Sequence, residues 1–348
     1  MKPVVSVICI TYNQEGYIRK ALDSFLEQKV SFPIEVIVHD DASTDGTAEI
    51  IREYTDRYPD IIRSTLETEN QYKSGSFQFV NDMFVSAKGK YIAMCEGDDY
   101  WSDPLKLQKQ VKYLDNHPSH AMCFSLAEVV YEDDSEEGRL SPELKKNREF
   151  NLGELLKDNF INTCTVMYRA RDDYESLVQS VLPQDLYIHV FHARDGRIGF
   201  LKEPMAVYRK QAGGVWWDSG DRMNAIYGKY RFQLTNLFSV LLEMLRNNRT
   251  YTKIINRHVD YLFDSFIVID KTKKTSLFLE TARDFPELVA GYTLRKYELL
   301  NEVNVERQRL QGLSNNQANE LQSIKESKWY RLNPRVIAQR HEHEPDAQ

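Results

Sequence analysis

An apolar run that ends at adjacent carboxylates constrains the fold of this chain more than any other feature. Residues 91–95 are continuously apolar, and Glu96, Gly97, Asp98 and Asp99 follow directly. A short apolar run with polar ends is typical of a strand buried on both faces of a parallel sheet. Such sheets bind ligands at the carboxyl ends of their strands, where carboxylate oxygens suit a divalent cation that carries a diphosphate. The alternative is an ordinary acidic turn before the next helix.

The N-terminal part of the chain alternates between strand-like and helix-like patterns. Apolar runs predict strands at residues 4–10, 34–38 and 61–66, and helical spacing of apolar residues predicts helices at 17–26, 48–54 and 77–87. Strands and helices that alternate at this spacing predict an α/β fold with a mostly parallel sheet. Further on, we expect a solvated loop between residues 129 and 150, where charges dominate, and a strand at 163–168.

The second expected strand also ends in acids. Residues 34–38 run through His39 into Asp40 and Asp41. Because the carboxyl ends of parallel strands share one edge of the sheet, we expect these two acids to lie in the same crevice as Asp98 and Asp99.

The first strand does not lead into a glycine-rich phosphate loop. Residues 11–16 read TYNQEG, without the glycine pattern of a dinucleotide-binding turn or the Gly-Lys-Ser/Thr of a P-loop. Dinucleotide dehydrogenases and P-loop NTPases are therefore disfavoured, and any phosphates would have to be held by carboxylates and a metal.

Charge and cysteine content narrow the class of protein. The chain has 45 basic and 52 acidic residues, a formal net charge of -7, so it lacks a basic field and we expect no nucleic-acid partner. Its four widely spaced cysteines predict small buried side chains in a reducing cytosol rather than disulfides. No leader and no apolar stretch of membrane-span length is evident, so we expect a cytoplasmic protein, with peripheral contact at the inner face of the membrane left open.

Three blocks of sequence resemble glycosyltransferase family 2, the inverting nucleotide-sugar glycosyltransferases with the GT-A fold. They are SVICITYN at residues 6–13, VHDDASTDGT at 38–47, and EGDDYW at 96–101 with DPLKL at 103–107. Their order and spacing are specific, and they cover about the first third of the chain. The resemblance implies a Rossmann-like, mostly parallel sheet flanked by helices, and transfer of a sugar from a nucleotide-diphosphate donor, most often a UDP-sugar.

The resemblance also assigns residues to the nucleotide side of such a site. It implies that Thr11 and Tyr12 line the nucleotide pocket and that Asp40 or Asp41 hydrogen-bonds the base. Asn70 lies where the family often places another donor contact.

On the diphosphate side, the resemblance implies that Asp98 sits near the ribose or sugar and that Asp99 ligates Mn or Mg. Arg209 is expected to help offset the charge of the departing diphosphate, in a segment that closes over it. Trp216 in that segment is a candidate for stacking on the sugar. Gln211 stands where many relatives have a histidine; its amide oxygen can coordinate a metal, but more weakly.

Asp185 opens an apolar helical segment, a place where the helix dipole alone also favours a carboxylate. In the resembling enzymes an acid here is the catalytic base. It would take the proton from an acceptor hydroxyl, which displaces the nucleotide in a single step and inverts the anomeric carbon. Two alternatives stay open: a sugar-phosphate nucleotidyltransferase, and a non-catalytic nucleotide- or carbohydrate-binding module.

The rest of the chain predicts helices alone. We expect a GT-A domain at residues 1–217, a helical appendage at 218–300, and a helical or coiled-coil tail with a disordered end at 301–348. The C-terminal helices could support a homo-oligomer. The expected acceptor is a carbohydrate or a lipid-linked glycan, as in glycan or surface polysaccharide synthesis.

Overall fold

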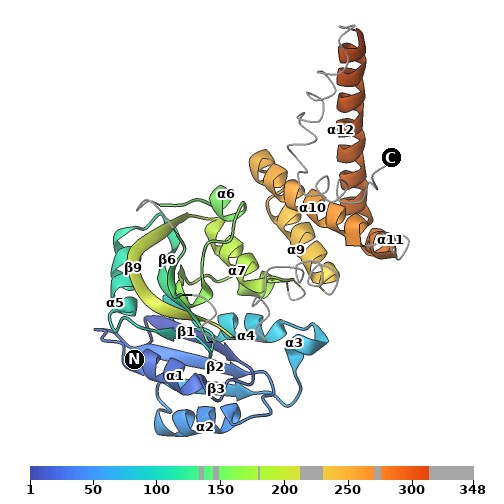
Figure 1. The fold of residues 1–348 in the computed structure, drawn as a ribbon. Helices are drawn as coiled ribbons and strands as arrows, with labels where there is room; N and C mark the ends of the chain where they lie inside the picture. The colour runs from blue at the N-terminus through green and yellow to red at the C-terminus, as the bar shows by residue number, and fades with distance from the viewer. Residues whose placement is uncertain (133–136, 144–148, 179–180, 212–229, 270–275, 313–348) are drawn as a thin grey trace. The chain divides into compact units, whose positions relative to one another are not determined.

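The computed structural model describes residues 1–132, 137–143, 149–178, 181–211, 230–269 and 276–312 (Figure 1). These residues divide into two compact units. The first holds residues 1–211 and Val240–Ile254, and the second holds 230–239 and 255–312, with the gaps just given. Every expected site residue lies in the first unit, apart from Trp216, which falls outside the described residues.

Nine strands of the described chain form one sheet, in the order β3-β2-β1-β4-β8-β6-β9-β5, with β7 paired to β6. Their bounds are β1 (Val5–Thr11), β2 (Ile34–Asp40), β3 (Ile62–Leu66), β4 (Tyr91–Met94), β5 (Tyr100–Trp101), β6 (His120–Tyr131), β7 (Arg139–Ser141), β8 (Met167–Arg169) and β9 (Arg197–Lys210).

The first four strands in sequence are all parallel. The connections carry α1 (Ile18–Leu26), α2 (Thr47–Arg57), the short α3 (Gln71–Ser74) and α4 (Gln78–Ser86). Figure 1 shows α1 and α2 on one face of this part of the sheet and α4 on the other. In the register of the strands Thr11 lies opposite Asp40, so the polar ends of β1 and β2 reach the same edge. The predicted α/β alternation is confirmed.

The remaining strands make a mixed half of the sheet. β8 runs antiparallel to both β4 and β6, β9 runs parallel to β6 over most of its length, and β5 pairs antiparallel with β9. The expected loop at 129–150 is wrong where β6 extends to Tyr131 and β7 pairs with it, because alternate residues of β6 are buried there. The expected strand at 163–168 begins as a 3-10 turn, η1 (Thr163–Thr165), since Thr165 N donates to Asn162 O.

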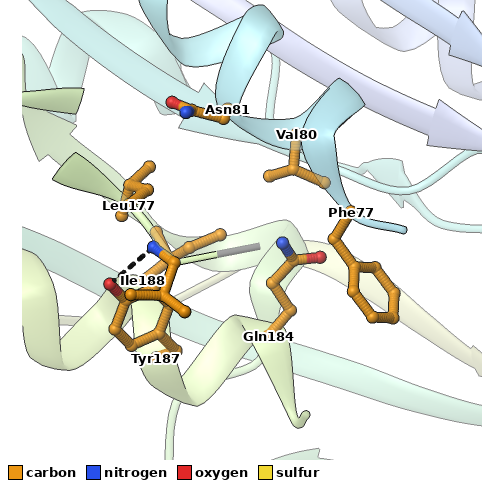
Figure 2. Close-up of a pocket in the computed structure, with 8 residues that line it drawn as sticks. Phe77, Val80, Asn81, Leu177, Gln184, Tyr187 and Ile188 are labelled. Carbon is orange, nitrogen blue, oxygen red and sulfur yellow. Dashed lines mark hydrogen bonds between the residues drawn. The ribbon is translucent and has the colours of Figure 1, made fainter. Parts of the chain in front are cut away.

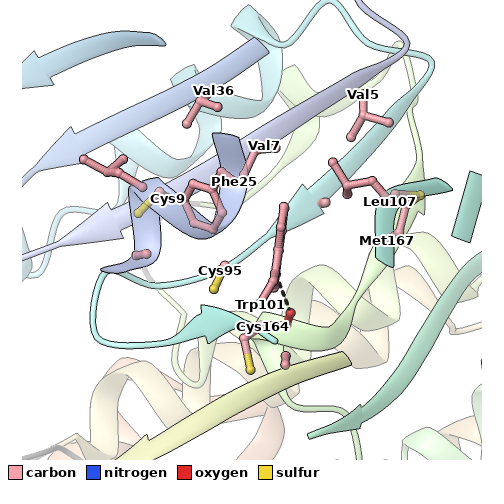
Figure 3. Close-up of a cluster of buried hydrophobic side chains, with 14 of the residues drawn as sticks. Val5, Val7, Cys9, Phe25, Val36, Cys95, Trp101, Leu107, Cys164 and Met167 are labelled. Atoms are coloured by element: carbon pink, nitrogen blue, oxygen red, sulfur yellow. Dashed lines mark hydrogen bonds between the residues drawn. The ribbon is translucent and has the colours of Figure 1, made fainter. Parts of the chain in front are cut away.

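One apolar layer lies between the sheet and three helices, α1, α2 and α5 (Lys106–Asn116). Alternate residues of β1, namely Val5, Val7 and Cys9, enter this cluster, and Phe25 of α1 packs on the ring of Trp101 at 4.6 Å (Figure 3). All four cysteines are buried and free, as the sequence predicts.

A second layer covers the opposite face. It lies under α4 and α7 (Gln184–Ala193). The short α6 (Leu152–Leu155) contacts α7, and η2 (Tyr174–Ser176) contacts α4. The ring of His192 stacks on Tyr168 at 4.1 Å, and Phe84 of α4 packs on Tyr174. His189 and His192 are both fully buried.

The C-terminal part is helical throughout the described residues. It contains α9 (Arg231–Met244), α10 (Arg249–Ile269), α11 (Ser276–Asp284) and α12 (Pro286–Gly312). Ion pairs join α10 to α12: Asp260 with Arg295, and Asp264 with Lys296. Within the described ranges no helix is both long enough and apolar enough to span a membrane.

Candidate active site

The loop between β4 and β5, residues 96–99, is called the acid loop below. It is held tightly against the end of β1, because Gly97 N donates to Ile10 O at 3.0 Å. A Cβ atom on Gly97 would lie 2.5 Å from Gln14 Oε1 and 2.7 Å from Thr11 Oγ1, so a side chain does not fit there. The glycine therefore allows the backbone of the acid loop to approach β1 closely.

The three carboxyl groups of the acid loop are crowded together. Burial, followed by the charges of Asp98 and Glu96, raises the pKa of Asp99 well above its usual range. Burial also raises the pKa of Asp98, and burial with the charge of Asp98 raises the pKa of Glu96 to about 8. A bound cation would relieve this repulsion.

The donor atoms fit a hard divalent cation, but they do not enclose one. Among the residues that the structure describes, no three His, Cys, Asp or Glu side chains are placed to hold a metal ion together. Mg²⁺ is usually held by one or two carboxylates, with water and substrate phosphates as the other ligands. Asp98 and Asp99 match that incomplete protein shell.

The end of β9 brings Arg209 to the acid loop. Its backbone N–H donates to Asp99 Oδ1 at 2.8 Å. Its guanidinium lies between two aromatic rings, 5.3 Å from the centroid of Tyr17 and 5.0 Å from that of Tyr100. The Nε atom is buried and has no hydrogen-bond partner among the residues that the structure describes. Arg209 is thus a positioned cation with an unused donor beside the acids.

Gln211 also reaches the acid loop. Its Nε2 donates to Asp98 Oδ2 at 2.8 Å. The side chain that we expected as a weak metal ligand therefore acts as a hydrogen-bond donor here. Trp216 cannot be placed, since it falls outside the described residues.

The acids after β2 are buried and bonded within the protein. Asp40 accepts hydrogen bonds from the backbone N–H and the hydroxyl of Ser43. Asp41 accepts from the backbone N–H of Gln71 at 2.7 Å and of Tyr72 at 3.0 Å. Asp41 thereby anchors the start of α3, whereas the hydrogen bonds to the Asp40 carboxylate from the described residues come from Ser43 in its own turn.

Three other residues expected on the nucleotide side lie around this turn. Asn70 caps α3 through Lys73 N and donates from Nδ2 to the backbone oxygen of Asp41 at 2.9 Å. Tyr12 is half-buried, and its hydroxyl accepts a hydrogen bond from Lys73 Nζ at 3.2 Å. Thr11 is buried at the end of β1. The structure places these residues at one edge of the sheet.

Asp185 lies in the first turn of α7, and its Oδ2 accepts a hydrogen bond from Asn159 Nδ2 at 3.0 Å. Its charge contributes to the raised pKa of Glu96, so the start of α7 is electrostatically coupled to the acid loop. The structure thus brings together two segments that are far apart in the sequence.

Sequence reasoning missed several residues of this region. Glu96 belongs to the motif, but only the adjacent Asp98 and Asp99 were assigned a role. Gln14, Tyr17 and Asn159 carry no recognisable signal, because a lone amide or tyrosine acquires its position only from the fold. Thr163 is another such residue: its side chain partly offsets the rise in the pKa of Glu96.

A small pocket lies between α4 and α7 (Figure 2). Its lining is mainly apolar, with the amides of Asn81 and Gln184 as polar groups; the other lining residues are Phe77, Val80, Leu177, Val178, Tyr187 and Ile188. The hydroxyl of Tyr187 accepts a hydrogen bond from Val178 N on its border. No charged residue lines the pocket, so it is unsuited to a diphosphate.

Comparison with known proteins agrees with this architecture. The pattern of the family "Glycosyl transferase family 2" matches residues 6–178. The chain is 38% identical over 284 residues to the uncharacterized protein Rv1520 of Mycobacterium tuberculosis, covering 82% of this chain and 81% of that protein. It is 31% identical over 215 residues to TuaG of Bacillus subtilis, named for teichuronic acid biosynthesis as a glycosyltransferase, covering 60% of this chain and 79% of TuaG.

Two solved structures have a similar fold. TarS residues 1–349 of S. aureus in complex with UDP-GlcNAc has a TM-score of 0.51 at 19% identity, covering 84% of this chain and 89% of that one. The mannosyltransferase PcManGT of Pyrobaculum calidifontis, in complex with GDP-Man and Mn²⁺, also has a TM-score of 0.51 at 19% identity, covering 85% of each chain. The chain therefore belongs to glycosyltransferase family 2 and has an α/β GT-A fold followed by C-terminal helices.

Proposed function

We propose that this protein is an inverting glycosyltransferase that moves a sugar from a nucleotide-diphosphate donor to a hydroxyl acceptor. The observation that carries the proposal is the acid loop, whose crowded carboxyls at the end of β4 are coupled to Asp185 at the start of α7. This arrangement offers a place for a diphosphate and its cation next to a carboxylate that can accept a proton.

For the donor, we propose Asp99 as a ligand of Mn²⁺ or Mg²⁺ and Asp98 as a contact to the ribose or sugar. The cation, when bound, supplies positive charge that stabilises the departing diphosphate. Arg209 adds a second positive charge, held in place by its two aromatic neighbours. Gln211 orients Asp98 through the amide hydrogen bond rather than acting mainly as a ligand. Trp216 keeps its proposed role of contacting the sugar.

For the nucleotide, we propose that Thr11 and Tyr12 line the base and ribose pocket. Asp40 or Asp41 would accept the imide hydrogen of a uracil. Both oxygens of each acid already accept a hydrogen bond within the protein, so the base would use a second lone pair of one of them. Asn70 would support this pocket through its bond to Asp41. A UDP-sugar is the proposed donor; TarS is a GT-A neighbour with UDP-GlcNAc bound, and PcManGT has GDP-Man bound.

For catalysis, we propose Asp185 as the base that takes the proton from the acceptor hydroxyl. Its hydrogen bond from Asn159 leaves one carboxylate oxygen free of described partners and orients the group. The acceptor oxygen attacks as the bond to the diphosphate breaks, so the anomeric configuration inverts.

The setting of the reaction extends the proposal. We propose a catalytic domain at residues 1–217 that acts in the cytoplasm or at the inner face of the membrane, on a carbohydrate or lipid-linked glycan acceptor of glycan or surface polysaccharide synthesis. Self-association through the C-terminal helices is proposed because α12 leaves large apolar side chains exposed, namely Leu294, Tyr297, Leu300 and Val305.

The test is calorimetric titration of the full chain with UDP, GDP and dTDP, each with and without Mn²⁺. We expect metal-dependent binding of one nucleotide, lost in Asp99→Ala and kept in Asp115→Ala, a control acid that pairs with Lys90 at the other end of β4. Absence of all nucleotide binding would contradict the donor site and favour a carbohydrate-binding module. Binding of a nucleoside triphosphate with sugar phosphate, and release of pyrophosphate, would favour a nucleotidyltransferase.

A further inference from the structure

A lysine is buried in the apolar layer near the acid loop. Lys106, the first residue of α5, is fully buried. Within the described residues its ammonium has one hydrogen-bond acceptor, Gln110 Oε1 at 2.8 Å, and it lies 4.4 Å from the ring centroid of Trp101. A buried charge with one neutral acceptor costs free energy, and apolar side chains of similar size often do better in such places. Packing alone therefore does not explain a lysine here.

Gln110 and Trp101, the two partners of the ammonium, both donate hydrogen bonds to η1. Gln110, which is also fully buried, donates from Nε2 to Thr165 O at 2.8 Å. Trp101 donates from Nε1 to Cys164 O at 3.0 Å, as Figure 3 shows. Successive carbonyl groups of η1 are thus bound by two side chains that Lys106 contacts.

The side chains of η1 in turn contact the acid loop. The hydroxyl of Thr163 partly offsets the rise in the pKa of Glu96, and the thiol of Cys164 partly offsets the rise in the pKa of Asp99. Contacts therefore lead from the ammonium to η1, whose side chains influence two of the three carboxyls, and to Trp101, which lies two residues after Asp99 in the chain.

A lysine has a property that an apolar residue lacks at this position. An ammonium only donates hydrogen bonds, so it requires Gln110 to turn its oxygen inward and leaves the amide nitrogen for η1. Its charge also favours one position of the Trp101 ring through the cation–π contact. Methionine would fill the same space and leave the amide free to rotate.

We propose that Lys106 is a positioning residue for sugar transfer, which acts through Gln110, Trp101 and η1 to hold the acid loop in its binding geometry. The inference rests on the proposed function for its catalytic meaning. Its structural part, an acid loop that is ordered by Lys106, can be measured without any ligand.

The charge on Lys106 is controlled by its surroundings. Burial lowers its pKa to about 8. The titratable groups that face it are the thiols of Cys95, Cys123 and Cys164 and the carboxyl of Asp103. The three thiols have raised pKa values because they are buried, so they stay neutral near pH 7. The ammonium is therefore the charge that changes in this cluster between pH 7 and 9.

The experiment compares Lys106→Met with Lys109→Met in the full chain. Lys109 lies on the same helix, but its ammonium pairs with Asp103 and Glu203. We expect backbone amides of residues 96–101 and 163–167 to exchange hydrogen at least ~10-fold faster in Lys106→Met, in the absence of ligand. Lys109→Met should exchange like the wild type. The melting temperature of Lys106→Met at pH 7 should equal or exceed that of the wild type.

The second readout is the affinity for UDP with Mn²⁺, which should be at least ~10-fold weaker in Lys106→Met. As the pH rises from 7 to 9, this ratio of wild-type to variant affinity should shrink, because the wild type loses the same charge. A ratio that does not change with pH would contradict a role for the ammonium. Unchanged exchange and unchanged affinity in Lys106→Met would overturn the proposal.

Two milder variants cover the case in which Lys106→Met does not fold. Gln110→Met and Trp101→Phe each remove one hydrogen bond to η1 and keep the lysine. We expect faster exchange at η1 and in the acid loop for both, and wild-type exchange in both would overturn the proposal. If the wild type itself binds no nucleotide, the proposed function fails, while the exchange data still decide whether Lys106 orders the acid loop.

Discussion

The acids after β2 and the acids after β4 look alike in the sequence and differ in the folded protein. Both pairs follow a buried strand and lie at the same edge of the sheet. Asp40 and Asp41 are bonded to backbone N–H groups of their own turn and of α3. Burial raises the pKa of Asp98, and burial together with the charges of Asp98 and Glu96 raises the pKa of Asp99. The first pair stabilises a loop, whereas the second stores unfavourable charge that a ligand can relieve.

The largest expected effect concerns Asp185, the acid at the start of α7. Asp185→Asn removes a base but keeps the size of the side chain, so kcat should fall by about 10²–10⁴-fold, with UDP affinity within about 3-fold of the wild type. Steady-state turnover of a UDP-sugar measures kcat, and calorimetry measures the affinity for UDP. Asp195→Asn is the matched control, since that acid pairs with Arg171 and Arg194 beyond the other end of α7. A rate equal to that of the control would exclude Asp185 as the base.

Asp99→Asn tests whether the second pair serves function at the expense of stability. The amide oxygen can still accept from Arg209 N, but the negative charge is lost. We expect turnover to fall by about 10²–10³-fold, while the melting temperature stays the same or rises because a buried repulsion is removed. Differential scanning calorimetry and turnover, measured on the same preparation, check both. A variant that is active and less stable would show that Asp99 is a structural acid like Asp41.

Asp41→Ala should give the opposite result. It leaves the partly buried N–H groups of Gln71 and Tyr72 without their acceptor, so the free energy of unfolding should fall by about 2–4 kcal/mol. Asp41→Asn keeps one acceptor and should lose about half as much. Urea unfolding followed by circular dichroism measures both. If neither variant is destabilised, Asp41 does not stabilise the folded protein, and the structural difference between the two acid pairs is contradicted.

The smallest effect is a pH dependence that comes from Lys106. Its pKa is lowered by burial from 10.5 to about 8, so between these pH values the unfolded chain binds the proton more tightly than the folded one. The contribution of Lys106 to the free energy of unfolding therefore rises with pH in this window, by at most about 3 kcal/mol.

The matched measurement is urea unfolding of wild type and Lys106→Met from pH 7 to 10. Any stability advantage of the variant should be largest below pH 8 and should shrink above it. A constant difference across the range would mean that the ammonium keeps an ordinary pKa in the folded protein.

The sequence predicted the parallel half of the fold more fully than the mixed half. Apolar runs such as residues 34–38 and the helical spacing around Phe25 depend on near neighbours in the chain, so they are visible without a structure. The pairing of β6 with β9 joins residues that are far apart in the sequence. Charges within residues 129–150 led us to expect a loop, but the described part of that segment includes the end of β6 and all of β7.

For the candidate site, the motifs identified the acids at 40–41 and 98–99, the acid at Asp185 and the segment with Arg209. They did not indicate which atoms are already bonded. The capping of α3 by Asp41, the ring contacts of Arg209 and the donation from Gln211 to Asp98 all require partners from distant segments. No local pattern encodes them.

The sequence by itself determined the order of strands and helices, the polar ends of the first strands and the resemblance to a family. Each of these features depends on residues that are close together in the sequence. The tertiary structure alone decided which carboxyls are bonded and which repel one another, and it placed Lys106 beneath Trp101 and Gln110. The physical reason is that burial and Coulomb interaction depend on distance in space. Two identical aspartates can therefore differ in pKa and in role through the side chains that surround them.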